Sequence, residues 1–504
     1  MSHRIHSVLF MGLLITGLIS LPAAAQSGRT FYIDYANGSN GNSGTTKSSP
    51  WKSHPYMQTG GACTGTGNAP AYAHQTGDHF IFAGGVTWPA ACFQMTIAAG
   101  GSSASAHDVY TVDQTWFSGG GFTKPVFDLA QNTTIGGNNV IKIYASNITI
   151  DGVEIKNQRV SSNGVSPCDA ATINFYGVSN ITVSNALVHD WVASSVSSGQ
   201  LSGHDTGSIC GGGNAGNYLV DSTIVHDQNG KIGSAAVGFG GCFRNIGEVA
   251  NSVCHNVGDG DVGYGQVHDS EFYNITNAEV AFDPAVHTNV IEVFYLGDGP
   301  IYNNLIHDNN PVGLTISVCA GPSLYNNVFW NNGNAAILID PGGNGGGSCG
   351  NQSTAISNIY NNTIAPGPNY VVRGLSRGIT IGGINLKNNH WITDTTPTCF
   401  NNAGSGCENV TSVNQANNVT MTTSTATSQG YTAANKLAPT SSSNGTVKTA
   451  ISLSGLCSGT LSSLCSDLLH NPRLLSWDAG AYEFGGSTQT TKPNPPSGLA
   501  AFVQ

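Results

Sequence analysis

Residues 148–155 read Ile-Thr-Ile-Asp-Gly-Val-Glu-Ile, and eight later segments repeat this order of a strand, a polar corner and a second strand. Two clear copies are Ile301-Tyr-Asn-Asn-Leu-Ile306 and Ile359-Tyr-Asn-Asn-Thr-Ile364. The remaining copies begin at Ile181, Tyr218, Val249, Val267, Leu324 and Leu386. A unit this small cannot bury its own apolar side, so it must stack on copies of itself. The repeat therefore predicts a solenoid.

The spacing of the repeat selects the kind of solenoid. The second corner residues lie at positions 152, 185, 222, 252, 270, 304, 327, 362 and 389, which is about 30 residues per unit on average. No segment carries the 3.6-residue apolar stripe of a helical repeat, and a propeller blade needs roughly 40 residues. Two or three short strands per turn therefore predict a parallel β-helix, with loops of variable length leaving its coils.

Apolar residues at alternate strand positions define the expected interior. Asn at the corners tolerates a left-handed backbone, and stacked Asn side chains should form a hydrogen-bonded ladder. The residues expected to point inward and stack along the axis are Ile148, Ile150, Ile155, Ile181, Val183, Val220, Ile224, Val328, Ile359 and Ile364.

The two ends of the chain differ from the repeat. Residues 1–25 read as a secretory signal, with Arg4, an apolar run from Val8 to Ile19 and a cleavage site at Ala23-Ala24-Ala25. The run ends at Pro22 and is too short for a bilayer. We expect a secreted protein with a β-helix domain over 26–485, irregular loops or a cap over about 395–470, and a Pro/Gly/Ser-rich tail over 486–504.

The chain has 12 Cys, which an exported protein can pair as disulfides. Residues close in sequence lie on the same or adjacent turns of a solenoid, so sequential bridges are geometrically easy, although sequence alone does not fix the connectivity. The suggested pairs are Cys63–Cys92, Cys168–Cys210, Cys242–Cys254, Cys319–Cys349, Cys399–Cys407 and Cys457–Cys465.

Charge is sparse, at 9% of residues with a net charge of −11. The chain has no basic stripe or tail, which argues against a nucleic-acid partner because phosphate binding needs clustered Lys and Arg. No segment after residue 25 is long and apolar enough to span a membrane. We expect a monomer.

Three further segments carry a family resemblance. They are Phe31-Tyr-Ile-Asp-Tyr-Ala-Asn-Gly-Ser-Asn-Gly-Asn-Ser-Gly44, Gly77-Asp-His-Phe-Ile-Phe-Ala-Gly-Gly-Val-Thr-Trp88 and Trp477-Asp-Ala-Gly-Ala-Tyr-Glu-Phe484. Together with the coils they resemble the pectate-lyase-like superfamily of secreted polysaccharide-active proteins. The resemblance implies an all-β, right-handed parallel β-helix with an N-terminal capping segment and C-terminal loops. It implies much less about activity, because this fold hosts lyases, hydrolases, epimerases, esterases and binding proteins.

Four His-Asp dipeptides suggest acid–base pairs, at His189, His226, His268 and His307. Three of them directly follow the second strand of a repeat, where other coils carry His255-Asn256 or Trp330-Asn331. Polar residues that recur at one coil position usually serve turns. We therefore interpret the four dipeptides as corner residues.

The densest irregular polar stretch, residues 240–300, is the predicted site. If Ile291 and Val293 point inward, Glu292 points outward on its strand. Asp283 and His287 should lie on the preceding corner, near the start of that strand. Active grooves in the superfamily that the chain resembles lie along an outer strand face, and the alternative is that Glu292 and His287 are ordinary strand and corner residues.

Two mechanisms could use this stretch. A lyase must neutralise a uronate carboxylate and remove the neighbouring proton. Ca²⁺ held by Asp259 and Asp261, with Asp283, would provide the first step. Lys231, Arg244 or His287 would provide the base. A hydrolase needs two carboxylates that flank the scissile bond, here Asp283 and Glu292.

Aromatic residues beside the polar stretch complete the hypothesis. Tyr264 and Tyr295 lie next to Gly-rich loops near the predicted carboxylates and are candidate sugar-binding platforms. The favoured function is a lyase that cleaves a uronate-containing extracellular polysaccharide by β-elimination. One alternative is a glycoside hydrolase. The other is a non-catalytic, carbohydrate-binding or adhesin-like β-helix protein. The low Lys and Arg content favours this second alternative, because a lyase usually needs a basic residue in its groove.

Overall fold

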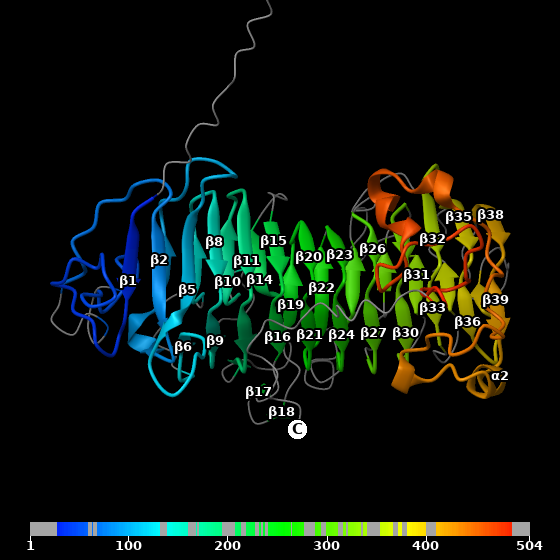
Figure 1. Ribbon diagram of the computed structural model, residues 1–504, viewed down its shortest axis with the longest axis horizontal. Coiled ribbons are helices and arrows are strands. Elements are labelled where there is room, and N and C mark those ends of the chain that lie inside the picture. Colours follow the sequence, from blue (N-terminus) through cyan, green and yellow to red (C-terminus); the bar gives the residue numbers. More distant parts are fainter. Residues whose placement is uncertain are drawn as a thin grey trace, which may run out of the picture.

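A computed structural model gives the structure of the chain over a defined set of residues. They are 28–58, 63, 68–131, 139–159, 168, 171–193, 207–212, 218–226, 231–232, 235–236, 240–263, 265–276, 288–293, 299–310, 316–318, 321–333, 336–339, 353–365, 371–374, 381–399 and 410–485. In these residues three long sheets of 13, 12 and 11 strands run along one elongated solenoid (Figure 1). We name them sheets A, B and C.

The strands of sheet A, from the N-terminal end of the solenoid, are β1 Thr30–Ile33, β2 His79–Gly84, β5 Asp108–Phe117, β8 Ile148–Asp151, β11 Ile181–Ser184, β15 Tyr218–Asp221, β20 Glu248–Ala250, β23 Gln266–His268, β26 Ile301–Tyr302, β29 Ser323–Tyr325, β32 Ile356–Tyr360, β35 Ile381–Lys387 and β38 Val410–Ala416.

The strands of sheet B, in the same direction, are β3 Thr87–Pro89, β6 Val126–Asp128, β9 Glu154–Lys156, β12 Leu187–His189, β16 Ile224–His226, β21 Val253–His255, β24 Glu271–Tyr273, β27 Leu305–His307, β30 Val328–Trp330, β33 Thr363–Ile364, β36 His390–Ile392 and β39 Val419–Met421.

The strands of sheet C are β4 Met95–Ile97, β7 Ile141–Ile143, β10 Ile173–Tyr176, β14 Gly207–Gly212, β19 Gly241–Arg244, β22 Asp259–Gly263, β25 Ile291–Val293, β28 Ile316–Val318, β31 Ile337–Ile339, β34 Val372–Gly374 and β37 Thr398–Cys399. A small separate sheet contains β13 Val192–Ala193, β17 Lys231–Ile232 and β18 Ala235–Ala236. The helical elements are short: η1 Ala90–Cys92, α2 Thr423–Ser428, η2 Ala433–Asn435, η3 Ser454–Leu456 and η4 Gly459–Cys465.

Each turn of the chain adds one strand to each long sheet. β8, β9 and β10 follow one another in sequence but belong to sheets A, B and C, and each pairs in parallel with the equivalent strand of the next coil. Parallel pairing of sequence-distant strands in all three sheets is the pairing pattern of a parallel β-helix. The predicted fold class is confirmed.

The interior is a set of columns of buried apolar side chains. In sheet B, Ile155 pairs in register with Val188, which pairs with Val225, and all three are 0–1% exposed. The column continues through Cys254, Phe272, Ile306, Phe329, Ile364 and Trp391. Burial of apolar surface stabilises a fold by about 25 cal/mol per Å², so these columns are the main source of the protein's stability.

Two of the ten residues predicted to face inward do not. Ile224 lies on the outer face of β16, and its neighbour Val225 takes the inward position. Val328 is fully buried, yet it pairs with Leu305 on the outer face of sheet B. It is covered by a cluster that includes Met421 and Tyr431 of the C-terminal segment. An apolar residue on the outer face that another segment covers therefore looks, in the sequence, like a residue of the interior.

The corners between sheets A and B confirm the predicted Asn ladder and divide it into two positions. The first corner residue has a left-handed backbone, with φ of 56° at Asn303 and 58° at Asn326. The second is buried and stacks on its equivalent in the next coil, as Asn304 Nδ2 donates to Asn327 Oδ1 at 3.0 Å. The ladder continues through Asn362, Asn389 and Asn418. The amides of Asn327 and Asn362 each also bond two backbone groups of the preceding coil.

Four of the suggested disulfides are present: Cys63–Cys92, Cys168–Cys210, Cys242–Cys254 and Cys457–Cys465. Cys242 and Cys254 are fully buried and join β19 of sheet C to β21 of sheet B across the interior. The other two suggested pairs include residues outside the described set. Disulfides of this kind form in oxidising compartments.

The two ends of the solenoid are closed by different means. At the N-terminal end, Phe31 stacks on Trp51 at 4.5 Å and on Phe80 at 5.7 Å, which forms an aromatic cap. At the other end, β37, β38 and β39 continue the three sheets within the segment 395–470. Irregular structure begins at Thr422. No helix in the described part of the chain is long and apolar enough to cross a membrane.

Residues 422–485 fold back over the last coils as a C-terminal return segment, orange to red in Figure 1. Its Trp477 and Leu464 cluster with Tyr325 and Tyr360 of sheet A. At Gly480, with φ of +94°, an added Cβ would lie 2.5 Å from Thr363 Oγ1. Glycine is required there because the return segment lies directly against the corner of β33.

Candidate functional site

A groove of about 530 Å³ lies on the outer face of sheet A. Its floor is one column of outward residues on four neighbouring strands, Thr182, Leu219, Glu248 and Gln266, which pair in register from coil to coil. These residues alternate with inward ones such as Ile181 and Val183, which is why a continuous outer row exists. Three strand spacings give the row a length of about 14 Å.

His107 forms part of the groove wall and precedes β5. Its Nδ1 lies 2.9 Å from Thr149 Oγ1. Burial lowers the pKa of His107 below its usual value of 6.5, against smaller opposing contributions from the Ile148 backbone and Asp108. The imidazole is therefore uncharged at neutral pH and able to accept a proton.

Glu248 brings a fixed carboxylate into the groove. Its Oε1 lies 3.2 Å from His268 Nε2, and His268 Nδ1 lies 2.7 Å from Asp269 Oδ2. Burial lowers the pKa of His268, but the hydrogen bonds to Asp269 and Glu248 outweigh it and raise the pKa overall. His268 is further held by stacking on Tyr302 at 4.7 Å.

The same Glu–His–Asp contact occurs twice on sheet B. His189 lies between Glu154 at 3.2 Å and Asp190 at 2.8 Å. His307 lies between Glu271 at 3.1 Å and Asp308 at 2.7 Å. The Asp of each pair has a left-handed backbone, so these dipeptides are corner residues, as predicted.

The imidazole rings on sheet B belong to a longer stack. Neighbouring ring centroids are 4.0–5.3 Å apart, and the ring faces are covered by one another. Rings packed face to face in this way cannot serve as flat platforms for sugars. The stack runs along the outer face of sheet B through His189, His226, His255, Tyr273, His307 and Trp330.

The predicted residues of sheet C are brought together in part. Arg244 pairs with Val262, and Val262 pairs with Glu292. Arg244 and Glu292 therefore lie in one outward column, two strands or about 10 Å apart. Glu292 occupies the predicted outward position but is only 3% exposed, so it is not the solvated strand residue of the alternative interpretation.

Glu292 and Asp259 share a partner that sequence reasoning missed. Asn289 donates its backbone N–H to Asp259 Oδ1 at 2.7 Å and its side-chain amide to Glu292 Oε2 at 2.7 Å. Asp259 is 1% exposed and Asn289 2%. In the structure both carboxylates therefore orient the chain that leads into β25.

The calcium prediction rests on Asp259 and Asp261. Asp261 pairs in register with Phe243 and Ile291, which are buried apolar residues. The group of described side chains that could share a metal ion contains His189, Asp190 and His226 and not Asp259. Calcium prefers six to eight oxygen ligands, and the described residues do not assemble such a set at Asp259. The calcium site stays a prediction.

Five predicted residues remain apart from these contacts. Lys231 lies on β17 of the small sheet and pairs with Val192 and Ala236, away from the column of Arg244. Four of the five lie outside the described residues: Asp283, His287, Tyr264 and Tyr295. Their predicted convergence with Glu292 stays untested.

The groove of sheet A was not predicted from the sequence. Thr182 and Leu219 are the second residues of their strands, whereas Glu248 and Gln266 are the first residues of theirs and precede the repeats that begin at Val249 and Val267. The register of the strands, and not the position in the repeat, shows the row. His107 belongs to no repeat and carries no comparable signal.

Comparison with solved structures gives likenesses at low identity. A rhamnogalacturonan lyase is 14% identical, with a TM-score of 0.40 over 78% of this chain and 87% of the other. A GH136 lacto-N-biosidase from Eubacterium ramulus is 12% identical, with a TM-score of 0.37 over 78% and 68%. The Dettilon tailspike protein is 11% identical, with a TM-score of 0.25 over 67% and 62%.

No protein-family model and no curated protein matches the chain. The strand pairing of the structure itself carries the fold assignment, because each of the three sheets is parallel and successive turns of the chain add strands to them in the same order. The chain is a parallel β-helix protein.

Proposed function

We propose that the protein binds an extracellular, uronate-containing polysaccharide along the groove of sheet A and cleaves it by β-elimination. The groove carries this proposal. It is open to solvent, and its floor of outward Thr, Leu, Glu and Gln side chains crosses four coils. An extended polymer can lie along such a row and contact one residue per coil.

The chemistry needs a base and a partner for the substrate carboxylate. The base removes the proton from C5 of the uronate, a C4–C5 double bond forms, and the C4–O bond breaks, after which the leaving oxygen takes up a proton. His107 is the proposed base, since burial lowers its pKa and leaves the ring uncharged.

Arg244 is the proposed partner of the uronate carboxylate. It ends β19 of sheet C and does not line the groove, but it precedes Glu248 of the groove by four positions in the chain. A guanidinium can pair with a carboxylate through two parallel hydrogen bonds, which favours the carbanion character that develops at C5. Lys231 and His287 remain alternative bases, and calcium at Asp259 and Asp261 remains a proposed aid to substrate binding.

The direct test incubates the protein with uronate and neutral polysaccharides, with calcium or with a chelator. Ultraviolet absorbance of unsaturated products identifies a lyase. New reducing ends without absorbance would replace the lyase by a hydrolase, and retained binding without any product would replace it by a binding protein. Absence of both binding and cleavage would refute the proposal.

Two variants locate the activity. His107→Gln should lower the rate by at least about 100-fold while the polysaccharide still binds. The matched control is His79→Gln, an exposed His on β2 of the same sheet, which should leave the rate unchanged. Thr182→Arg should obstruct the groove and weaken binding without touching the interior, because Thr182 points outward. Normal binding by Thr182→Arg would place the substrate elsewhere.

A further inference from the structure

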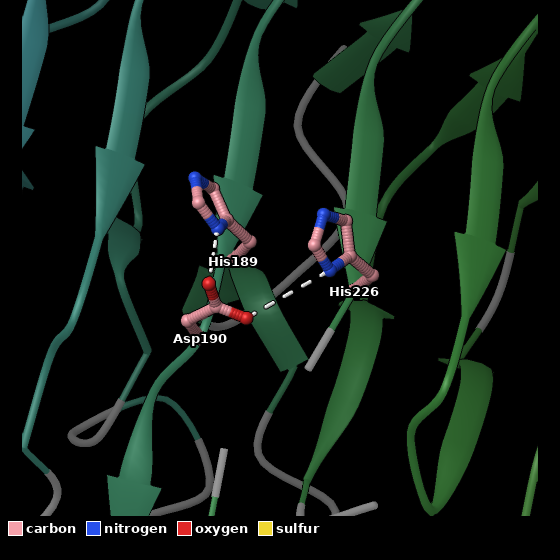
Figure 2. Close-up of side chains that lie close together, drawn as sticks. All are labelled: His189, Asp190 and His226. Atoms are coloured by element: carbon pink, nitrogen blue, oxygen red, sulfur yellow. Dashed lines mark hydrogen bonds and ion pairs between the residues drawn. The ribbon is translucent and has the colours of Figure 1, made fainter. Parts of the chain in front are cut away.

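Two imidazoles and one carboxylate meet where the small sheet leaves the solenoid. His189 ends β12 and His226 ends β16, and these two residues pair in register on adjacent coils. Their ring centroids are 5.0 Å apart. Asp190 has a left-handed backbone, with φ of 60°, and this turn places its carboxylate between the two rings (Figure 2).

The separations are close to those of metal ligands. His189 Nδ1 lies 2.8 Å from one carboxylate oxygen of Asp190, and His226 Nδ1 lies 4.0 Å from the other. One ligand atom from each of the three residues lies within 4.8 Å of those from the other two. Ligand atoms around a tetrahedral zinc ion are about 3.4 Å apart. Small side-chain rotations would bring the three groups onto one ion.

We propose that His189, Asp190 and His226 form a binding site for a divalent transition-metal ion of the zinc type. Imidazole nitrogen with carboxylate oxygen is a ligand set that suits zinc, whereas calcium prefers oxygen alone. The site lies on the outer face of sheet B. It is independent of the groove on sheet A and of the proposed polysaccharide cleavage.

The surroundings of His189 support this assignment. Its Nε2 lies 3.2 Å from Glu154 Oε1, and Lys156 Nζ lies 3.5 Å from the same carboxylate oxygen. A metal-bound His commonly donates its second N–H to a carboxylate, which fixes the ring and raises its basicity. Glu154 would hold His189 with Nδ1 directed at the ion.

The protonation of the two rings differs. Burial, with the neighbouring His255 and His189, lowers the pKa of His226 to about 3, so its ring is uncharged at neutral pH. Burial lowers the pKa of His189 as well, but Asp190 and Glu154 outweigh it and raise the pKa to about 9. The two rings therefore differ in charge at neutral pH.

The chain contains its own comparison sites. His268 and His307 have the same Glu and Asp contacts as His189. The ring that follows in register is Tyr302 beside His268 and Trp330 beside His307. Asp269 beside His268 also contacts His470 Nε2 at 3.0 Å, so of these two sites it is the His307 site that has no second imidazole among the described contacts. Replacement of His307 therefore provides a control with nearly the same surroundings.

The site would fasten the base of the small sheet. β13 begins two residues after Asp190, and β17 follows His226; Val192 of β13 pairs with Lys231 of β17. An ion shared by the two coils would hold these strands together where they leave sheet B. Its effect on the protein is thus structural, and its loss should loosen the small sheet first.

The test titrates metal-stripped full-length protein with Zn²⁺ by calorimetry and with Co²⁺ by visible absorption. Wild type should bind one ion per chain. His226→Tyr should weaken binding at least tenfold, and its fold should survive because Tyr273 occupies the same column of the stack. Asp190→Asn should also weaken binding, since Asn tolerates a left-handed backbone.

His307→Tyr should bind zinc as wild type does, and far-UV circular dichroism should be unchanged in all three variants. Tetrahedral Co²⁺ absorption that disappears in His226→Tyr would support the assigned ligands. The proposal is overturned if wild type does not bind zinc, if His226→Tyr binds it equally well, or if His307→Tyr weakens binding as much as His226→Tyr.

Discussion

Neighbouring corner side chains have different physical roles although both are commonly Asn. The first, such as Asn361 with φ of 51°, supplies a left-handed backbone conformation that few residue types tolerate. The second, such as Asn362, is fully buried and joins three coils through its amide. The first position therefore depends on backbone preference and the second on hydrogen bonding.

Replacement of Asn362 by Ala should be strongly destabilising. Its Nδ2 donates to Leu324 O at 3.0 Å and to Asn389 Oδ1 at 3.1 Å, and its Oδ1 accepts from the Asn327 backbone at 3.0 Å. Truncation removes the hydrogen bonds to Leu324 O and from the Asn327 N–H and should cost about 3 kcal/mol, while Asn389 Oδ1 keeps the Asn362 backbone N–H as a donor. Urea unfolding measures the loss, with Asn414→Ala on the exposed face of β38 as a control that should change little. Equal midpoints for the two variants would contradict the role of the ladder.

Sequence predicts the corners better than it predicts the site. The Asn-Asn pairs, their left-handed backbone and their ladder follow from local chemistry that is the same in every coil. The burial of Glu292 does not follow from the strand pattern, because alternation predicts only which face a side chain occupies. Its contact with Asn289 depends on how the preceding corner folds. His107 enters the groove from outside the repeat, so no periodicity reveals it.

Strands of sheet B carry a row of rings that responds to acid. Burial lowers the pKa of His255 to about 4, and burial with the neighbouring rings lowers that of His226 to about 3. An unfolded chain takes up these protons near pH 6.5, whereas the folded chain does not. The stability that the uncharged rings contribute is therefore present above pH 6.5 and lost as pH falls toward 4.

His255→Tyr should reduce this acid sensitivity. Tyr273 already follows His255 in the same stack, with centroids 4.6 Å apart, so Tyr fits the column. Between pH 7 and pH 5 wild type should lose up to about 2 kcal/mol through His255, a loss that the variant avoids. His189 acts in the opposite sense, because its raised pKa removes stability as pH rises toward 9.

Thermal melting at pH 7 and pH 5 measures the difference between His255→Tyr and wild type. His79→Tyr, at the exposed first residue of β2, is the control and should keep the acid sensitivity of wild type. If His255→Tyr and wild type lose the same stability at pH 5, folding does not lower the pKa of His255 and the prediction is wrong.

The stability of the whole solenoid depends on the return segment that covers its last coils. Arg473 of the return segment is fully buried, with Nη1 2.6 Å from Glu483 Oε1 and Nη2 2.9 Å from Asn326 Oδ1. Burial raises the pKa of Glu483 to about 7 even beside this cation, so the ion pair is strongly desolvated. Sequence could predict that this segment leaves the repeat, but not that it returns over β29.

Arg473→Met should release the return segment. The substitution leaves Glu483 buried without its cation, which costs about 3–5 kcal/mol for a buried pair. We expect faster limited proteolysis within residues 453–484 and a lower melting temperature, while the coils before β29 stay protected. Lys448→Gln, an exposed change in the same segment, should behave as wild type. Unchanged proteolysis of Arg473→Met would show that the apolar cluster alone holds the segment.

The register of the ladder has a consequence for how the chain can change in length. Asn303, Asn304 and Asn309 each contact the residue 23 positions further on. Removing those 23 residues as one block would join equivalent points of two coils and leave every column continuous. A deletion of half that size would offset all three sheets at once. The stacked strands can therefore be added or removed only by the complete turn, whereas the loops between them differ in length from coil to coil.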